Sequence, residues 1–221
     1  MNKKSSFRDF AIILIAALPS IYLAITWQSI PAIIPTHYNI RFEPDQTGSK
    51  NFLWTVTGSM FVVSVLVYLL LKNIHRIDPK RYKLERQGAF IRMGVGCVVF
   101  ISAFCLLAII ASTKNIKLLN YLLIPFLGLM FSFLGNNMNN IKPNYFAGFR
   151  LPWTLESESN WKKTHHLAGK LWFWGGLLIV IIGVLFPMKI AIFIMFGLLI
   201  IMTIIPIVYS YMTFKKEKNQ S

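Results

Sequence analysis

Residues 190–214 read IAIFIMFGLLIIMTIIPIVYSYMTF and contain no charged side chain. A helix that crosses the hydrocarbon core of a bilayer, about 30 Å thick, needs about 20 predominantly apolar residues. Residues 52–71, 93–113 and 118–141 are also free of charge. A chain of 221 residues, 55% of them hydrophobic and 14% charged, is too small to bury so many long apolar runs in a soluble core. The sequence therefore predicts an integral membrane protein.

Six apolar segments predict an all-α integral membrane protein with six transmembrane helices. Pro19, Pro125 and Pro206 fall inside these segments, where neighbouring helices can satisfy the freed carbonyl groups, so we expect kinks there. The first segment follows a basic stretch, as in a signal peptide. Its apolar part is long and no A-x-A cleavage site follows, which favours a retained signal-anchor. We place the spans at 10–28, 52–71, 91–112, 118–135, 170–187 and 190–213.

The distribution of basic side chains predicts how the spans are oriented. The chain has 23 Lys and Arg residues and a net charge of +15. Most of these residues lie at the N-terminus, in alternate connections and in the C-terminal tail, which the positive-inside rule assigns to the cytoplasm. Both termini are therefore expected inside (N-in/C-in). The basicity reflects topology, and we predict no direct contact with nucleic acid. The outer side holds only Arg41, Lys50, Lys114, Lys117 and Lys189.

The positions of the spans and of the basic patches suggest four parts of the chain. We expect an N-terminal two-helix unit at 1–71 and a basic cytoplasmic linker at 72–90. A four-helix unit should follow at 91–214, with a cytoplasmic loop at 135–170, and a basic tail at 215–221 completes the chain.

The outer loop at 30–50 reads IPAIIPTHYNIRFEPDQTGSK and is too rich in proline and polar residues to be a plain spacer. Its imidazole and carboxylate groups are acceptable metal ligands, but their spacing matches no strong metal motif, and we assign no metal site. The alternative is a rigid turn in which Lys50 and Arg41 pair with the carboxylates. The candidate ligands are His37, Glu43 and Asp45.

The cytoplasmic loop at 135–170 is the second informative segment. Pro143, Gly148 and Pro152 predict an ordered turn in its middle, and a helix should begin after Thr154. On that helix, spacing of three and four residues places four side chains on one face. These are Trp161, Thr164, His165 and Ala168.

Each of these polar residues also has an interpretation in which it only builds the loop. Arg150 would then bond backbone carbonyl groups, and His165 would cap a turn. Four tryptophans would suit the membrane interface, where Trp is enriched, and would anchor the chain there. They are Trp153, Trp161, Trp172 and Trp174.

The sequence contains no recognisable catalytic motif. There is no H-E-x-x-H, no G-x-S-x-G and no phosphate-binding glycine loop. Ionisable residues are almost absent from the spans, which disfavours a proton-coupled or ion-pumping role. We therefore predict that the protein is not an enzyme, has no catalytic residues and needs no cofactor.

The outer loop resembles the N-terminal domain of unknown function of the SdpI family of bacterial membrane proteins. That signature runs I-P-x-H-x-N, followed by a G-E-P-D-like turn and G-S-K. One departure is that Phe42 stands where the family usually has glycine. The matching residues are Pro35, His37, Asn39, Glu43, Pro44, Asp45, Gly48, Ser49 and Lys50.

The cytoplasmic loop resembles the same family through the ordered elements G-N, P-N-x-x-x-G-x-R-x-P-W-T-L, W-x-x-T-H and G-K. Together the two loops extend the resemblance over most of the chain, from about residue 10 to 210, and the family implies six spans as well. The matching residues are Gly135, Asn136, Pro143, Asn144, Gly148, Arg150, Pro152, Trp153, Thr154, Leu155, Trp161, Thr164, His165, Gly169 and Lys170.

The resemblance implies a multi-pass protein of the bacterial cytoplasmic membrane that gives immunity to a secreted antimicrobial peptide toxin. It also implies signalling, in which a transcriptional repressor is held at the membrane. The partners expected are thus the lipid bilayer, a peptide toxin outside and a repressor inside. The expected contacts are His37, Asn39, Glu43, Asp45 and Lys50 in the outer loop, and Asn136, Asn144, Arg150, Pro152, Trp153, Thr154, Trp161, Thr164, His165 and Lys170 in the cytoplasmic loop.

Two other classes of function remain open at this point. A small transporter or flippase for a peptide, lipid or ion is favoured by the kinking prolines and disfavoured by the shortage of charge inside the spans. A membrane enzyme would require a metal held by the loop of His37 or that of His165.

Overall fold

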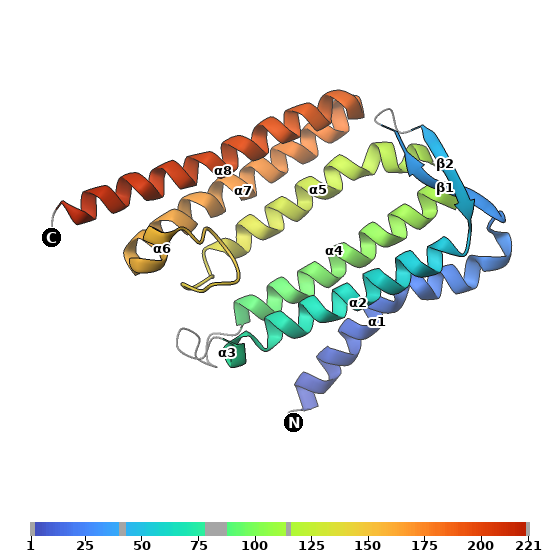
Figure 1. The fold of residues 1–221 in the computed structure, drawn as a ribbon, viewed down its shortest axis with the longest axis horizontal. Helices are drawn as coiled ribbons and strands as arrows, with labels where there is room; N and C mark the ends of the chain where they lie inside the picture. The colour runs from blue at the N-terminus through green and yellow to red at the C-terminus, as the bar shows by residue number, and fades with distance from the viewer. Residues whose placement is uncertain (1–2, 40–42, 78–87, 114–115, 220–221) are drawn as a thin grey trace. The chain divides into compact units, whose positions relative to one another are not determined.

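The computed structural model describes residues 3–39, 43–77, 88–113 and 116–219. Most of the described residues are helical, and their one sheet is a two-stranded hairpin (Figure 1). The elements are α1 (Lys3–Thr26), a 3-10 helix (Trp27–Ser29), β1 (Ile33–Tyr38), β2 (Pro44–Ser49), α2 (Phe52–Lys72), α3 (Ile74–Ile77), α4 (Gly88–Thr113), α5 (Ile116–Met138), α6 (Pro152–Glu156), α7 (Glu158–Leu185) and α8 (Met188–Lys218).

Six of the described helices, α1, α2, α4, α5, α7 and α8, are long and apolar enough to cross a membrane. This confirms the predicted fold class of six apolar helices. The N-in/C-in orientation stays a prediction. The fifth span differs most from its predicted bounds, because α7 begins at Glu158 rather than near residue 170. Its start is capped by the Ser157 hydroxyl, which accepts a hydrogen bond from the Asn160 backbone N–H at 3.1 Å.

Spatial contacts divide the chain into two compact units. Unit 1 comprises Met1–Asn73 and Gly94–Asn120, and unit 2 comprises Ile74–Met93 and Tyr121–Ser221. The third span, α4, thus contributes most of its length to unit 1. The sequence-based division into parts stays a prediction, and most of its linker, residues 78–87, lies outside the described residues.

The core of unit 1 joins the hairpin to the helices that carry it. Leu23 of α1, Leu53 of α2 and Ile109 of α4 form a buried cluster with Ile34 of β1. The two strands pair antiparallel, with Ile33 opposite Ser49. Because the buried Ile34 side chain is part of the helical core, the hairpin is fixed to the end of the bundle rather than suspended on a loose loop.

A polar cluster lies at the ends of α1 and α2 that are farthest from the hairpin. The Tyr68 hydroxyl donates to Asp9 Oδ1 at 2.6 Å, and Arg8 Nε donates to the Tyr68 hydroxyl at 3.3 Å. Lys72 forms an ion pair with Asp9. The charged groups near the ends of these two spans are therefore paired within unit 1, as burial near a low-dielectric medium requires.

Small residues let α5 and α7 of unit 2 approach each other closely. A Cβ added at Gly135 would lie 2.3 Å from the backbone N of Phe173, and one at Gly128 would lie 2.7 Å from the carbonyl O of Gly176. Ser132, between these glycines on α5, donates its hydroxyl to the Phe173 carbonyl at 2.9 Å. Small residues at a helix contact and a serine bonded across it are typical of membrane helices.

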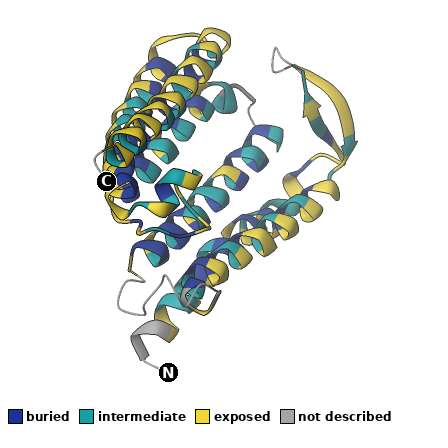
Figure 2. Ribbon diagram, turned by 60° about the vertical axis from the view of Figure 1, so that its left-hand side comes forward, coloured by how far each residue is buried: buried dark blue, intermediate teal, exposed yellow. Residues whose placement is uncertain are grey.

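The outward faces of unit 2 are apolar and exposed. Along α8 the exposed side chains include Phe193, Phe196, Ile200 and Ile204, and much of this helix is exposed in Figure 2. The buried side of α8 packs on α7 through Ala191 and other members of the unit 2 core. An apolar exposed face combined with a packed inner face is what lipid contact requires of a span.

Candidate functional site

The hairpin of β1 and β2, which contains the predicted outer loop, presents an exposed histidine–carboxylate pair. His37 Nδ1 lies 2.7 Å from Asp45 Oδ1, and the two side chains are 59% and 39% exposed. They stand on neighbouring strands, because His37 pairs with Gln46 across the sheet. The hydrogen bond holds the imidazole in one orientation while more than half of the side chain stays exposed.

A second polar pair closes the same hairpin. The Asn39 amide donates to Glu43 Oε2 at 3.3 Å, and Asn39 Oδ1 accepts from the Glu43 backbone N–H at 3.1 Å. The backbone N–H of Asn39 also donates to the carbonyl of Glu43 at 3.0 Å. Both predicted outer residues therefore shape the turn and occupy each other's hydrogen-bonding groups.

Lys50 holds the base of the hairpin. Its ammonium group donates to the carbonyls of Trp27 at 3.0 Å and Ile30 at 3.1 Å, and it lies 4.5 Å from the centre of the Trp27 ring. The expectation that Lys50 pairs with the loop carboxylates is therefore wrong, because backbone carbonyls occupy its donors. Its proposed partner in that role, Arg41, lies outside the described residues.

The candidate metal ligands of the outer loop do not gather. Asp45 contacts His37, whereas Glu43 contacts Asn39. Within the described ranges, no group of three His, Cys, Asp or Glu side chains is arranged to hold a metal ion. The geometry present here is that of two hydrogen-bonded pairs rather than of a metal centre.

His165, on the first part of α7, is the residue on which the loop between α5 and α7 folds. It is 1% exposed, and its Nε2 accepts the backbone N–H of Phe149 at 3.0 Å. Its Nδ1 lies 2.9 Å from the carbonyl O of Trp161. A carbonyl only accepts and an N–H only donates, so this arrangement requires a neutral imidazole with its proton on Nδ1. The loop-building interpretation of His165 thus describes what this side chain does in the structure.

The other predicted members of the helix face are buried with His165. Trp161 stacks on His165 with ring centres 4.0 Å apart and donates its indole N–H to the Ile141 carbonyl at 2.8 Å. Thr164 donates to the side chain of Asn160 at 3.0 Å. The periodicity therefore placed Trp161, Thr164 and His165 correctly on one face. Interfacial anchoring is wrong for Trp161, because this side chain is only 2% exposed.

Asn144 and Arg150 fold the loop onto itself. The Asn144 side-chain oxygen accepts the backbone N–H groups of Phe146 at 2.7 Å and Ala147 at 2.8 Å. The guanidinium group of Arg150 donates to the carbonyl of Tyr145 at 2.6 Å. Arg150 thus bonds a carbonyl, as its loop-building interpretation predicts, although the residue remains exposed.

Pro152 and Thr154 start the short helix α6. Pro152 occupies the first turn, where its missing N–H costs no hydrogen bond. The buried Thr154 hydroxyl accepts the Leu151 backbone N–H at 3.0 Å and donates to the Phe149 carbonyl at 2.7 Å. Both residues therefore fix where the loop turns back into the helix.

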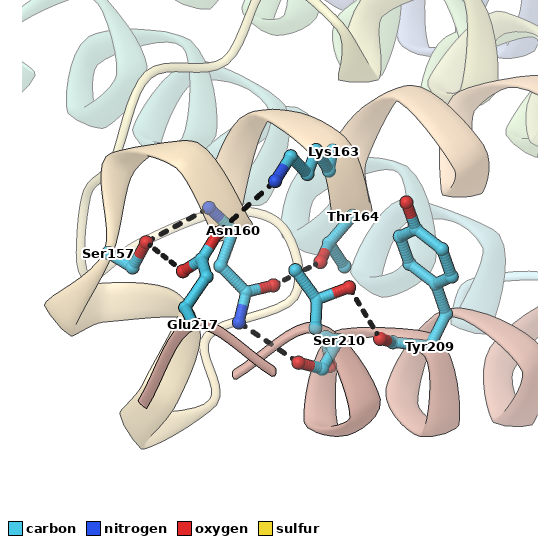
Figure 3. Close-up of polar contacts among 8 residues, drawn as sticks. Ser157, Asn160, Lys163, Thr164, Tyr209, Ser210 and Glu217 are labelled. Carbon is cyan, nitrogen blue, oxygen red and sulfur yellow. Dashed lines mark hydrogen bonds and ion pairs between the residues drawn. The ribbon is translucent and has the colours of Figure 1, made fainter. Parts of the chain in front are cut away.

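A polar network then ties the start of α7 to the end of α8 (Figure 3). Asn160 is fully buried and donates its amide to the Ser210 carbonyl at 2.9 Å. Glu217 accepts from the Ser157 hydroxyl at 2.8 Å and pairs with Lys163 at 3.2 Å. These contacts hold the start of α7 against α8.

The remaining predicted residues of this loop have different roles. The indole N–H of Trp153 donates to the Ser210 hydroxyl at 2.9 Å, so this ring is held by α8. Asn136 and Lys170 lie exposed on α5 and α7. Asn160, Ser210 and Glu217 were not singled out from the sequence. Only Asn160 carried a signal, as a polar residue one turn before Thr164.

A mostly apolar pocket of about 360 Å³ lies under the loop in unit 2. Its wall includes Gly148, whose φ of +97° is accessible to glycine at little cost. A Cβ there would lie 2.2 Å from His165 Nε2. The pocket is lined by Met93, Leu134, Met138, Ile141, Gly148, Phe149, Trp172 and Thr203.

Six apolar helices and two ordered polar loop structures define a multi-pass membrane protein. Residues 140–210 match the SdpI/YfhL protein family, and residues 14–61 match a domain of unknown function, DUF1648. The chain is 24% identical over 206 residues to the immunity protein SdpI of Bacillus subtilis (strain 168), covering 92% of this chain and 94% of that protein. The predicted SdpI family resemblance is thereby confirmed, and the protein is a multi-pass protein of the bacterial inner membrane. No solved structure matches it.

Proposed function

We propose that this chain is a membrane immunity protein that protects a bacterium against a secreted antimicrobial peptide toxin. The observation that carries the proposal is the similarity to an immunity protein over nearly the full length of both chains. The match at residues 14–61 includes the whole hairpin, and the match at residues 140–210 includes all but the first residue of the loop between α5 and α7, residues 139–157, here called the folded loop. Most of the two segments that the sequence singled out, 30–50 and 135–170, therefore lies in the matched regions, although Asn136 does not.

In this proposal the toxin contacts the outer hairpin. His37 and Asp45 are exposed and hold each other in place at 2.7 Å, so little side-chain freedom would be lost on binding. Lys50 supports them from below by fixing the hairpin base to Trp27 and Ile30. The contact surface is thus carried by His37 and Asp45, with Lys50 as a positioning residue.

The response would be carried by the outer surface of the folded loop. His165, Thr154 and Asn144 are buried and engaged inside it. Tyr145 is 53% exposed, and Arg150 is exposed beside it. We infer that a cytoplasmic repressor would contact Tyr145 and Arg150, while the buried residues keep that surface in shape.

Survival of a toxin-sensitive bacterium that expresses the chain tests the immunity proposal. A panel of secreted membrane-active peptide toxins is titrated against cells carrying the wild type, a His37→Ala, Asp45→Ala variant, or Gln46→Ala as a control. Gln46 is exposed on the same strand as Asp45. We expect protection by the wild type and the control, and loss of most protection in the double variant at equal membrane abundance.

Recruitment is tested separately with a Tyr145→Ala, Arg150→Ala variant. Protection should persist, whereas a DNA-binding protein that co-purifies with the wild type after toxin exposure should be lost.

In the survival test, sensitivity to every peptide of cells that express the wild-type chain would overturn the immunity proposal. Toxin flux into vesicles containing the purified chain would instead support the transporter alternative.

A further inference from the structure

One exposed stripe of α7 changes from basic to apolar along its length. Lys163, His166, Lys170, Trp174 and Ile181 follow one another at spacings of three, four, four and seven residues, so they lie on one side of the helix. All five are exposed, Trp174 by 66% and Ile181 by 52%. Neither the hairpin nor the folded loop uses this stripe.

The basic end of the stripe borders a hollow of about 460 Å³. It is lined by Asn139, Lys162, Lys163 and His166, all within unit 2. Ammonium, amide and imidazole groups supply several hydrogen-bond donors and positive charge to one small volume. Such a set of groups suits an oxyanion such as a phosphate.

Part of this charge is not neutralised by the protein. Lys163 pairs with Glu217 at 3.2 Å. In the part of the chain that the structure describes, Lys162 and Lys170 have no carboxylate partner within ion-pair distance. Two ammonium groups, one in the hollow and one two turns further along α7, therefore remain available to an external anion.

The positions along the helix match the profile of a phospholipid. A helix rises about 1.5 Å per residue, so Trp174 lies about 6 Å beyond Lys170 and Ile181 about 10 Å further on. Trp is enriched at the level of the lipid headgroups. With Trp174 at that level, Lys170 and His166 lie on the aqueous side and Ile181 lies in the hydrocarbon. The positive-inside rule accounts for the lysines being on one side, but not for the alignment of Lys163 and Lys170 with this tryptophan.

We propose that this stripe is a binding site for an anionic phospholipid of the inner membrane. Its phosphate is held by His166 of the stripe and by Lys162, which lines the hollow beside it, Lys170 contacts the headgroup two turns further along α7, and the acyl chain runs past Trp174 to Ile181. The site is separate from the proposed toxin contact, so the lipid proposal stands or falls independently of immunity. Bound lipid would lie beside the Lys163–Glu217 pair that connects α7 to α8.

Native mass spectrometry of the detergent-purified full chain tests the proposal, with phosphatidylglycerol and phosphatidylcholine of equal chain length as probes. The test variant is Lys162→Gln, Lys170→Gln. The control, Lys215→Gln, Lys216→Gln, removes the same charge from exposed positions on α8. We expect the wild type and the control to prefer phosphatidylglycerol by about tenfold and the test variant to lose that preference, since each basic residue near a membrane surface adds to anionic lipid attraction.

Further variants distinguish a specific lipid site from general attraction of the lipid by positive charge. A Lys162→Arg, Lys170→Arg variant keeps the charge and should keep the preference, which also guards against misfolding of the glutamine variant. Equal loss in the α8 control, or an unchanged preference in the α7 variant, would overturn the proposal. Complete displacement of phosphatidylglycerol by millimolar inorganic phosphate would overturn it too, because the hollow would then take the free anion rather than a lipid.

Discussion

At the scale of single residues, the polar side chains of the folded loop act chiefly by holding backbone groups. His165 accepts the N–H of Phe149, and Thr154 accepts that of Leu151. The backbone groups of a loop have no partners in a helix or sheet. Side chains must bond those that are buried, because an unpaired buried N–H costs about 1–3 kcal/mol. The density of polar residues between residues 135 and 170 is thus explained first by the needs of the backbone.

Replacing His165 by alanine should destabilise unit 2 by about 2 kcal/mol or more, because the Phe149 N–H loses its buried acceptor. The stacking partner of Trp161 is lost as well. The neighbouring His166 is exposed, so His166→Ala should change stability by less than about 0.5 kcal/mol. Thermal unfolding in detergent, followed by size-exclusion chromatography, compares the two. Equal midpoints for both variants would contradict this role of His165.

Gly148 lets the loop approach His165 closely enough for the hydrogen bond from the Phe149 N–H. Alanine at this position would have to adopt a φ of +97° and would place its Cβ 2.2 Å from His165 Nε2. Strained backbone and a steric clash each cost about 1–3 kcal/mol, so Gly148→Ala should lower the unfolding midpoint clearly. Gly197→Ala is the matched control, because a Cβ there meets nothing within 4 Å. A stability of Gly148→Ala equal to that of this control would refute the assignment.

At the scale of elements, the contact between α5 and α7 depends on small residues at regular intervals. Gly135 lies against Gly169, and Gly128 against Gly176. In a membrane, helices associate through close packing rather than through exclusion of water. The firm position of the folded loop, which connects these two helices, follows from this close approach of their backbones.

Gly135→Ala tests that contact. The added Cβ would lie 2.3 Å from the backbone N of Phe173, which is part of a helix and cannot move aside. Overpacking costs about 1–3 kcal/mol, more than the gain of up to about 1 kcal/mol in helix propensity from Gly to Ala. Gly58→Ala, with open space around its Cβ, should show only the gain. We expect a lower unfolding midpoint for Gly135→Ala than for Gly58→Ala, and the opposite order would contradict the proposed packing.

The elements also show what the sequence could and could not predict. Long charge-free runs determine spans, so all six were found from residue type alone. The helix expected after Thr154 and the fifth span, expected from residue 170, proved to be one continuous helix, α7, and this continuity was missed because residues 158–169 are polar and hydropathy does not mark them as part of a span. The hairpin was predicted only as a rigid turn, since its strands contain Pro35 and a polar second half that lack a clear strand pattern.

The same limit applies to the candidate site. Helical periodicity places Trp161, Thr164 and His165 on one face, because that relation is local. Their partners come from elsewhere in the chain: Phe149 and Ile141 precede the helix, and Ser210 lies on α8. Such long-range pairs depend on tertiary packing, which a single sequence does not encode in its spacing.

At the scale of the whole molecule, the proposed toxin and repressor contacts require the hairpin and the folded loop to lie on opposite sides of the membrane. The hairpin connects α1 to α2 and the folded loop connects α5 to α7. Counting spans along the chain puts an odd number of crossings between them. If all six helices cross the membrane, both termini lie on one side, and the positive-inside rule predicts that this side is the cytoplasm.

Cysteine labelling in intact cells tests this topology. In a background in which Cys97 and Cys105 are alanine, a Gln46→Cys or a Glu156→Cys replacement introduces one exposed thiol, on the hairpin or on α6. A membrane-impermeant maleimide should modify the hairpin thiol in intact cells and the α6 thiol only after the membrane is opened. The reverse order of labelling would show that the chain has the opposite orientation in the membrane, with the hairpin in the cytoplasm and the folded loop outside. Labelling of both thiols in intact cells would mean that an even number of spans separates them. The proposed toxin and repressor contacts would then lie on the same side of the membrane.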